Sequence, residues 1–207
     1  MNRYGQYVDG KTIAAVGRAK PNGDQSVDIG SKDLIMVASY FGETVPEYYS
    51  RCDITVLNRH HARMLVEDPS IAERMKVDWV LLRTPKFSPS GEFKTRVVGG
   101  PAYFEGAGNQ IPIFLNDIVK FSPASVNVYG TDLYLSGYDL TRPAGDIYDF
   151  EETKANMIKH NQPKVRRYYQ LMCELYPFII PDVRLDRILG MSDNEFLSEL
   201  SDVWGGL

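Results

Sequence analysis

The sequence predicts an α/β domain with a Rossmann-like, mainly parallel sheet flanked by helices, followed by a short C-terminal helical tail. Its short apolar runs are continuous rather than alternating, as in strands buried on both faces of a parallel sheet. Amphipathic stretches with helical spacing fall between and after these runs. Of the 207 residues, 43% are hydrophobic and 24% are charged, a composition ordinary for a domain with a full core.

Six runs rich in β-branched residues are expected to form the strands: Thr12–Val16, Leu34–Ala38, Ile54–Leu57, Trp79–Leu82, Arg96–Val98 and Val126–Tyr129. Four stretches carry helix signals: Pro112–Phe121, a stretch from Asp149 and Glu152 toward Lys159, a stretch from Pro163 that ends before Pro177, and Phe196–Val203 after a capping box at Ser192–Glu195. We divide the chain into a Rossmann-like domain, residues 1–176, and a helical C-terminal extension, residues 177–207.

Charge and composition narrow the classes of partner. The net charge of −4 argues against a nucleic-acid-binding surface. No run approaches the about 18 apolar residues of a membrane span, and residues 1–11 are polar, so no signal peptide is expected. Cys52 and Cys173 pair only if the fold brings them together, and so few cysteines favour a reducing compartment, the cytoplasm. The tail from Pro181 to Trp204 is free to cover its own domain, a second copy or a longer parent protein.

Residues that follow strands are the first candidates for a site, because ligands of such sheets bind beyond the carboxyl ends of the strands. Gly17 ends the first strand and allows a ligand close to the backbone, whose amides could meet a phosphate; a plain turn glycine is the alternative. Asn58 ends the third strand. Its amide could bond a ribose hydroxyl and a base edge, or it could simply close a strand-end turn.

A carboxylate, a phenol and a histidine complete the candidates. Asp132 and Tyr134 follow the sixth strand and Gly130, and the loop Ser136–Ile147 beyond them is a natural lid. His160 precedes a helix, where an imidazole can act as a general base near neutral pH, although a lone histidine is more often a surface residue. His60 and His61 are adjacent and do not share a helical face, so no metal site is expected.

The order of these features along residues 12–176 resembles the sialyltransferase-like glycosyltransferases, in particular glycosyltransferase family 42 and, more distantly, family 29. The resemblance rests on Gly17, Asn58, the strand Lys76–Arg83 before Pro85, the helix 112–121, the stretch Val128–Tyr134, and His160 ahead of a helix.

Such enzymes bind a CMP sugar and transfer the sugar to a glycan hydroxyl with inversion, without a metal or another cofactor. The resemblance implies donor-binding roles for Gly17, Arg18, Asn58, Asn109, Gln110 and Gly130. It further implies that Asp132, Tyr134 and Tyr138 (or Tyr148) act at the leaving phosphate, and that His160 deprotonates the acceptor hydroxyl. These side chains suit those roles, because phenol hydroxyls stabilise charge on a leaving phosphate and histidine accepts a proton near pH 7.

Two stretches depart from the family pattern and leave the donor sugar open. Arg18–Pro21 stands where the family usually has Asn-Gly-Pro-Ser or similar, and Asn109–Ile111 replaces a Thr-Ser-Gly type stretch. These changes favour an alternative, a module of the same fold that binds a nucleotide or glycan without catalysis. A third alternative is a small α/β nucleotide hydrolase, whose metal-binding carboxylates would have to be Asp132 and Asp139.

Overall fold

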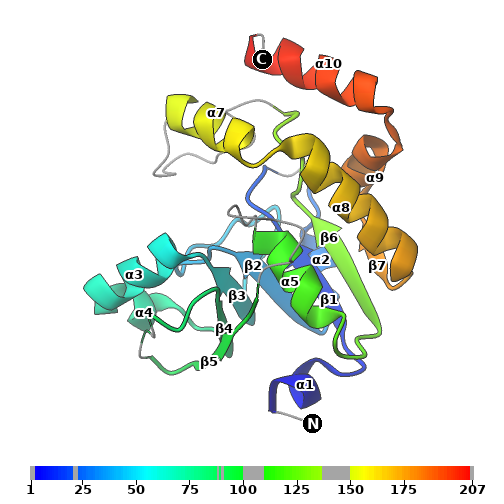
Figure 1. Cartoon of the computed structure of the whole chain (residues 1–207). Helices are drawn as coiled ribbons and strands as arrows, with labels where there is room; N and C mark the ends of the chain where they lie inside the picture. Colours follow the sequence, from blue (N-terminus) through cyan, green and yellow to red (C-terminus); the bar gives the residue numbers. More distant parts are fainter. Residues whose placement is uncertain are drawn as a thin grey trace.

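The structure is a computed structural model that describes residues 3–20, 23–87, 89, 91–99, 110–136 and 150–205. The described strands form one parallel sheet in the order β5-β4-β3-β2-β1-β6-β7, flanked by helices (Figure 1). The strands are β1 (Thr12–Val16), β2 (Leu34–Ala38), β3 (Ile54–Leu57), β4 (Trp79–Leu82), β5 (Lys94–Val97), β6 (Ser125–Tyr129) and β7 (Ile179–Pro181). The predicted Rossmann-like α/β fold is therefore confirmed.

The helices carry the labels of Figure 1. They are α1 (Arg3–Val8), α2 (Ser26–Gly30), α3 (Arg59–Glu67), α4 (Pro69–Arg74), α5 (Gln110–Ile118), α7 (Phe150–Lys159), α8 (Gln162–Leu175), α9 (Val183–Gly190) and α10 (Asp193–Trp204). The predicted capping box before α10 is present, because Ser192 accepts the N–H of Glu195 while the Glu195 carboxylate accepts the N–H of Ser192.

Two strands at the rims of the sheet differ from the sequence-based expectation. β5 covers Lys94–Val97 rather than Arg96–Val98, because it is a largely exposed edge strand with little apolar pattern to mark its ends. β7 was not predicted. It has three residues, ends in a proline and pairs with β6, so residues 177–207 contribute a strand to the sheet as well as two helices.

Side chains that alternate along the strands fill one hydrophobic layer on each face of the sheet. Ile13 and Ala15 of β1 face a cluster built with α1, α5 and α7 to α10. Ala14 and Val16 face a second cluster built with α2, α3 and α4. This burial on both faces explains why the strands read as continuous apolar runs.

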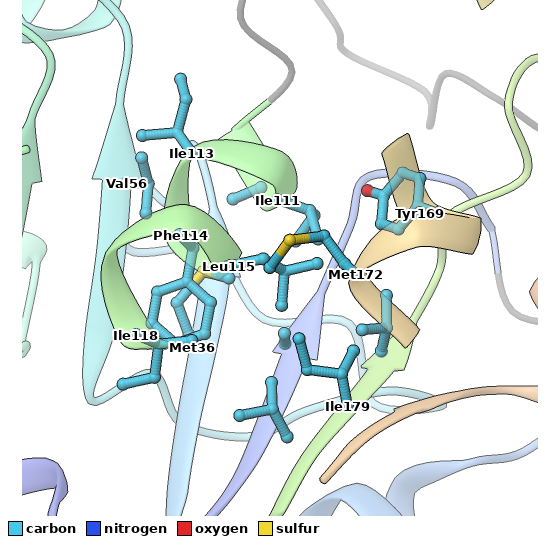
Figure 2. Close-up of a cluster of buried hydrophobic side chains, with 14 of the residues drawn as sticks. Met36, Val56, Ile111, Ile113, Phe114, Leu115, Ile118, Tyr169, Met172 and Ile179 are labelled. Carbon is cyan, nitrogen blue, oxygen red and sulfur yellow. The ribbon is translucent and has the colours of Figure 1, made fainter. Parts of the chain in front are cut away.

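The helix α5 lies at the centre of the first cluster. Figure 2 shows its Phe114 and Ile118 beside Met36 of β2, and its Leu115 facing Met172 of α8. Each such buried side chain contributes about 1.5–3 kcal/mol of hydrophobic stabilisation. The helix also buries the Asp117 carboxylate, which accepts two hydrogen bonds of 2.9 Å from the Arg96 guanidinium.

The strand order defines where a ligand would bind. From β1, the chain proceeds outward through β2 to β5 on one side, and β6 and β7 lie on the other side. The switch point between the two directions therefore lies between β1 and β6. At the edge of the sheet where the strands end, here called the carboxyl edge, such a point is the usual ligand site of the fold class. The opposite edge is called the amino edge.

Candidate functional site at the carboxyl edge

At the switch point, the backbone segments that follow β1 and β6 cross in direct contact. The N–H groups of Gly17 and Ala19 donate to the carbonyl oxygens of Tyr129 (2.8 Å) and Gly130 (3.1 Å). A Cβ atom at Gly17 would collide with the Gly130 carbonyl oxygen and would lie 3.0 Å from Thr131 Oγ1. Gly17 thus makes room for another part of the chain, and its amide is already engaged.

Gly130 fulfils the reciprocal requirement. Its φ of 60° lies in the left-handed region that favours glycine, and a Cβ atom there would lie 3.1 Å from the Gly17 carbonyl oxygen. The buried Tyr48 hydroxyl closes the crossing by donating to the Ala19 carbonyl oxygen at 2.8 Å. The structure therefore brings the predicted residues Gly17 and Gly130 together. The amides of Gly17 and Ala19 both donate to backbone carbonyl oxygens.

Ser39, the first residue after β2, joins two predicted donor-binding residues. Its carbonyl oxygen accepts from Arg18 Nη1 at 3.2 Å, and its Oγ accepts from Gln110 Nε2 at 2.9 Å. Ser39 is buried and has a φ of 57°, a left-handed conformation that costs a non-glycine residue about 1 kcal/mol or more. Such local strain is typical of functional sites, and here it turns the Ser39 carbonyl toward Arg18.

The Arg18 guanidinium also forms an ion pair. Its Nη1 atom lies 2.6 Å from Glu43 Oε1, and the side chains of Arg18 and Glu43 are 26% and 38% exposed. The other oxygen of the same carboxylate accepts the backbone N–H of Phe41 at 2.7 Å. The carboxyl edge beside the switch point thus holds a half-buried cation together with an anion that solvent can reach.

Asn58 caps α3. Its Oδ1 atom accepts the backbone N–H of His61 at 2.8 Å, and its own backbone is extended, as an N-cap residue requires. Its Nδ2 atom has no partner among the residues that the structure describes. For a ligand at this edge, Asn58 can therefore offer donors, whereas its acceptor oxygen belongs to the helix.

The edge is cationic over β3 and β4. Arg59 and Lys86 lie 5.8 Å and 6.0 Å from the ring centre of Phe87, which packs on the second hydrophobic cluster. Arg83 directly follows β4. Within the described part of the chain, none of these three cations forms an ion pair with an acidic side chain. An anionic ligand would therefore meet favourable charge along this half of the edge.

Asp132 organises the turn after β6. Its carboxylate is buried and accepts the backbone N–H groups of Tyr134 (3.0 Å) and Ser136 (3.3 Å). These bonds hold Leu133 and Tyr134 in left-handed conformations with φ of 48° and 67°. Both oxygens of Asp132 thus have backbone donors, which fits a role in positioning Tyr134.

The half-buried Tyr134 is fixed from the C-terminal side by Trp204. The indole Nε1 donates to the Tyr134 carbonyl oxygen at 2.9 Å, and the two rings meet edge to face at 6.1 Å. The same indole stacks on Phe150 at 5.4 Å, and the Trp204 carbonyl oxygen accepts from Lys154 Nζ at 2.9 Å. Trp204 therefore connects α7 to the carboxyl edge at β6.

His160 lies between α7 and α8, directly before the N-cap residue Asn161, whose side chain accepts the N–H of Lys164. It is half-buried. The structure thus gives His160 the predicted place ahead of a helix N-terminus. Tyr138, Asn109, Tyr148 and Asp139 lie outside the described residues, as does the predicted lid Ser136–Ile147 except for its first residue.

Sequence reasoning did not single out three residues of this edge: Ser39, Glu43 and Asp182. Ser39 carried the same signal as Gly17, because it directly follows a buried strand. Asp182 follows the unpredicted β7; its carboxylate caps α9 through the N–H of Leu185 (2.8 Å) and accepts the N–H of Gly130 (3.3 Å). Burial raises the pKa of the Asp182 carboxyl, and these backbone hydrogen bonds oppose the shift. Glu43 lies in a loop without a motif.

The two cysteines are free thiols on different elements, Cys52 before β3 and Cys173 in α8. In the described part of the chain, no helix is long and apolar enough to cross a membrane. No group of three or more His, Cys, Asp or Glu residues among those described could hold a metal ion.

In comparisons with known proteins, no protein-family model and no curated protein matches this chain.

Proposed function

We propose that this protein is a glycosyltransferase of the sialyltransferase-like kind, which transfers a sialic-acid-like sugar from a CMP-type nucleotide to a glycan hydroxyl, with inversion and without a metal. One observation carries the proposal: the segments that motivate the family resemblance, Gly17–Arg18 and Gly130–Tyr134, lie more than 100 positions apart in the sequence and meet at the switch point. Sheets of this class bind nucleotides at that place.

The donor nucleotide is proposed to lie across the end of β1, with its phosphate at Arg18. A guanidinium can offer two parallel N–H groups to phosphate oxygens, which makes it a strong partner for this group. Gln110 and Asn58 supply side-chain amide donors from α5 and from the end of β3. These donors take the place of the backbone amides of Gly17 and Ala19, which are engaged within the chain.

The chemistry is assigned to the side of the edge formed by β6. As the sugar leaves, negative charge develops on the phosphate, and the hydroxyl of Tyr134, with that of Tyr138, is proposed to stabilise it. His160 is proposed to accept the proton of the acceptor hydroxyl. Asp132 holds the turn that carries Tyr134. We place the reaction in the cytoplasm, because both cysteines are free.

A second candidate is a binding module of the same fold that does not catalyse. This candidate is favoured because polar groups at the carboxyl edge already form hydrogen bonds within the chain. They are both Asp132 oxygens, the Asn58 oxygen and the Gly17 amide. Such a module would bind a CMP-type nucleotide or a glycan and leave the donor intact. Donor hydrolysis by the purified protein separates the two candidates.

Nucleotide binding is the first experiment, because a ligand of the native state raises the melting temperature. We expect CMP to stabilise the protein more than UMP, AMP or GMP at equal concentration. Arg18→Gln should abolish most of that shift. Arg51→Gln is the matched control, since Arg51 also pairs with a carboxylate and bonds backbone carbonyls, but at the amino edge. Equal shifts from all four nucleotides would refute the proposed donor.

The catalytic assignment is tested at His160. Loss of a general base lowers rates roughly 10²- to 10⁴-fold, so His160→Ala should reduce sugar transfer by that order and leave the affinity for CMP unchanged. The matched control is His60→Ala, an exposed histidine at the start of α3. If both variants transfer sugar within about twofold of the wild type, His160 is not the base.

A further inference from the structure

We propose that Arg18 and the backbone N–H of Phe41 form a phosphate subsite, and that the chain's own Glu43 occupies this subsite in the ligand-free protein. This proposal rests on the proposed function in one respect: the phosphate that binds is taken to belong to a CMP-type donor. The recognition of an anion at this place follows from the contacts of Glu43 alone.

The Glu43 carboxylate is held as a small oxyanion ligand would be held. One oxygen lies 2.6 Å from Arg18 Nη1, and the other accepts the Phe41 N–H at 2.7 Å. A guanidinium and a backbone amide that converge on two oxygens of one anion are the donors that proteins offer to phosphate. The two donors come from different strand ends, Arg18 after β1 and Phe41 after β2.

The surrounding chain holds these donors in place independently of Glu43. Arg18 Nη1 also donates to the Ser39 carbonyl oxygen, and Ser39 is itself bonded by Gln110. Tyr40, between Ser39 and Phe41, donates its N–H to Thr55 Oγ1 at 3.1 Å in the buried sheet. Because these contacts do not involve Glu43, the subsite persists when the carboxylate leaves.

Glu43 reaches the subsite through a turn at Gly42. The φ of Gly42 is 96°, a conformation that L-amino acids rarely adopt. A Cβ atom there would lie 3.0 Å from Cβ of Arg74 and 3.2 Å from its carbonyl carbon. The chain therefore turns back at Gly42, which lets the Glu43 side chain bond the amide two residues before it.

The contact is one that a phosphate can displace. The Glu43 side chain is 38% exposed, so the ion pair lies within reach of water, and such pairs contribute little to stability. A phosphate monoester carries up to two charges and three acceptor oxygens, against one charge on the carboxylate. Glu43 therefore acts as an internal competitor that keeps weakly binding anions out and yields to a phosphate.

Isothermal titration with inorganic phosphate, CMP and cytidine tests the proposal. Removing the competing charge with Glu43→Gln should tighten phosphate and CMP binding roughly 3- to 10-fold and leave cytidine binding unchanged. Arg18→Gln should weaken CMP binding at least about tenfold. The matched control is Glu67→Gln, which removes a carboxylate that pairs with Arg63 at the same distance, 2.6 Å, on the exposed face of α3. It should change neither affinity.

The outcomes separate this subsite from the proposed function. If Glu43→Gln binds phosphate more tightly but CMP no better than UMP or AMP, the subsite is supported and the CMP donor is refuted. If CMP binds the wild type, Glu43→Gln and Arg18→Gln equally well, the subsite is refuted, and with it the placement of the donor phosphate at Arg18, whereas CMP as the donor nucleotide stands. Absence of phosphate binding by both the wild type and Glu43→Gln also refutes the subsite. Arg18→Lys keeps the charge and replaces Arg18→Gln if the latter does not fold.

Discussion

The charged residues that immediately flank the strands β1 to β4 differ between the amino edge and the carboxyl edge of the sheet. An aspartate directly precedes each of β2, β3 and β4, namely Asp33, Asp53 and Asp78, whereas an arginine lies within two residues after β1, β3 and β4, namely Arg18, Arg59 and Arg83. Parallel strands expose N–H donors where they begin and carbonyl acceptors where they end. Carboxylates therefore complement one edge and cations the other.

The charged side chains at the two edges differ in how many hydrogen bonds they form with the rest of the chain. At the amino edge, Asp33 accepts the N–H and the hydroxyl of Thr12, and Asp53 accepts the Ile35 N–H at 2.7 Å. Asp78 accepts the Tyr7 hydroxyl at 2.6 Å. At the carboxyl edge, Arg18 bonds the Ser39 carbonyl oxygen after β2, whereas Arg59 and Arg83 form no ion pair with an acidic side chain among the described residues. We infer that the aspartates of the amino edge stabilise the fold, whereas the arginines after β1, β3 and β4, together with Glu43, contribute little to stability and can serve a ligand.

The largest loss of stability is expected at Gly17, where the backbone segments after β1 and β6 cross. Gly17→Ala should destabilise the protein by about 3 kcal/mol or more, because the new Cβ atom collides with the Gly130 carbonyl. Urea denaturation measures this. The control is Gly30→Ala in α2, where an added Cβ meets nothing within 4 Å and stability should hold or rise slightly. Equal stability of the two variants would show that the crossing is not tight.

A smaller change in stability distinguishes a carboxylate of the amino edge, Asp53, from one of the carboxyl edge, Glu43. Asp53→Ala should lower the free energy of unfolding by about 1–3 kcal/mol, because the Ile35 N–H loses its acceptor. Glu43→Gln should change stability by less than about 0.5 kcal/mol. Chemical denaturation of both variants, with exposed Glu73→Ala on α4 as a surface control, makes the comparison. A larger loss in Glu43→Gln than in Asp53→Ala would contradict the division between the edges.

An effect smaller than that of Asp53→Ala concerns a carboxylate beside the end of β6. Tyr129 donates to Asp28 at 2.5 Å, and hydrogen bonds from Lys32 and then Tyr129 lower the pKa of the Asp28 carboxyl. A lowered native pKa stabilises the fold above the unfolded-state value and loses that effect as the pH falls through the native value. Tyr129→Phe should therefore cost about 1 kcal/mol at pH 7, and less below the ordinary aspartate pKa of about 3.9.

Urea midpoints between pH 2.5 and pH 7 measure this dependence. Tyr176→Phe is the control, because the Tyr176 hydroxyl forms no hydrogen bond with any described residue, and its effect should not vary with pH. A cost of Tyr129→Phe that stays constant over the whole range would mean that the Asp28 charge does not contribute to the contact.

The sequence predicted the centre of the sheet better than its rims. The bounds of β1 to β4 match the prediction because these strands are buried on both faces, which produces unbroken apolar runs. The edge strand β5 is largely exposed, and β7 has three residues of which one is proline, so neither leaves such a run. Short helices such as α1 and α2 are below the length at which helical periodicity can be recognised.

The rule that ligands bind beyond the carboxyl ends of parallel strands located Gly17, Asn58 and Gly130 in the sequence. It could not predict what these residues contact. Gly17 meets Gly130, 113 positions away, and this contact depends on β6 returning beside β1. Asn58 contacts a local partner, the His61 amide, which is why the turn-forming alternative was visible from the sequence. The same rule applied to Ser39, which directly follows β2, but the strain of Ser39 and its bonds to Arg18 and Gln110 exist only in three dimensions.

The contacts of Trp204 also have an optical consequence. The chain has two tryptophans, and one lies near each edge of the sheet: Trp79 begins β4 and meets the Tyr4 ring at 5.0 Å, whereas Trp204 bonds the turn after β6. Replacing Trp79 with phenylalanine leaves an indole whose fluorescence reports on the surroundings of Tyr134. Changes at the carboxyl edge can then be followed by stopped-flow emission without an attached dye.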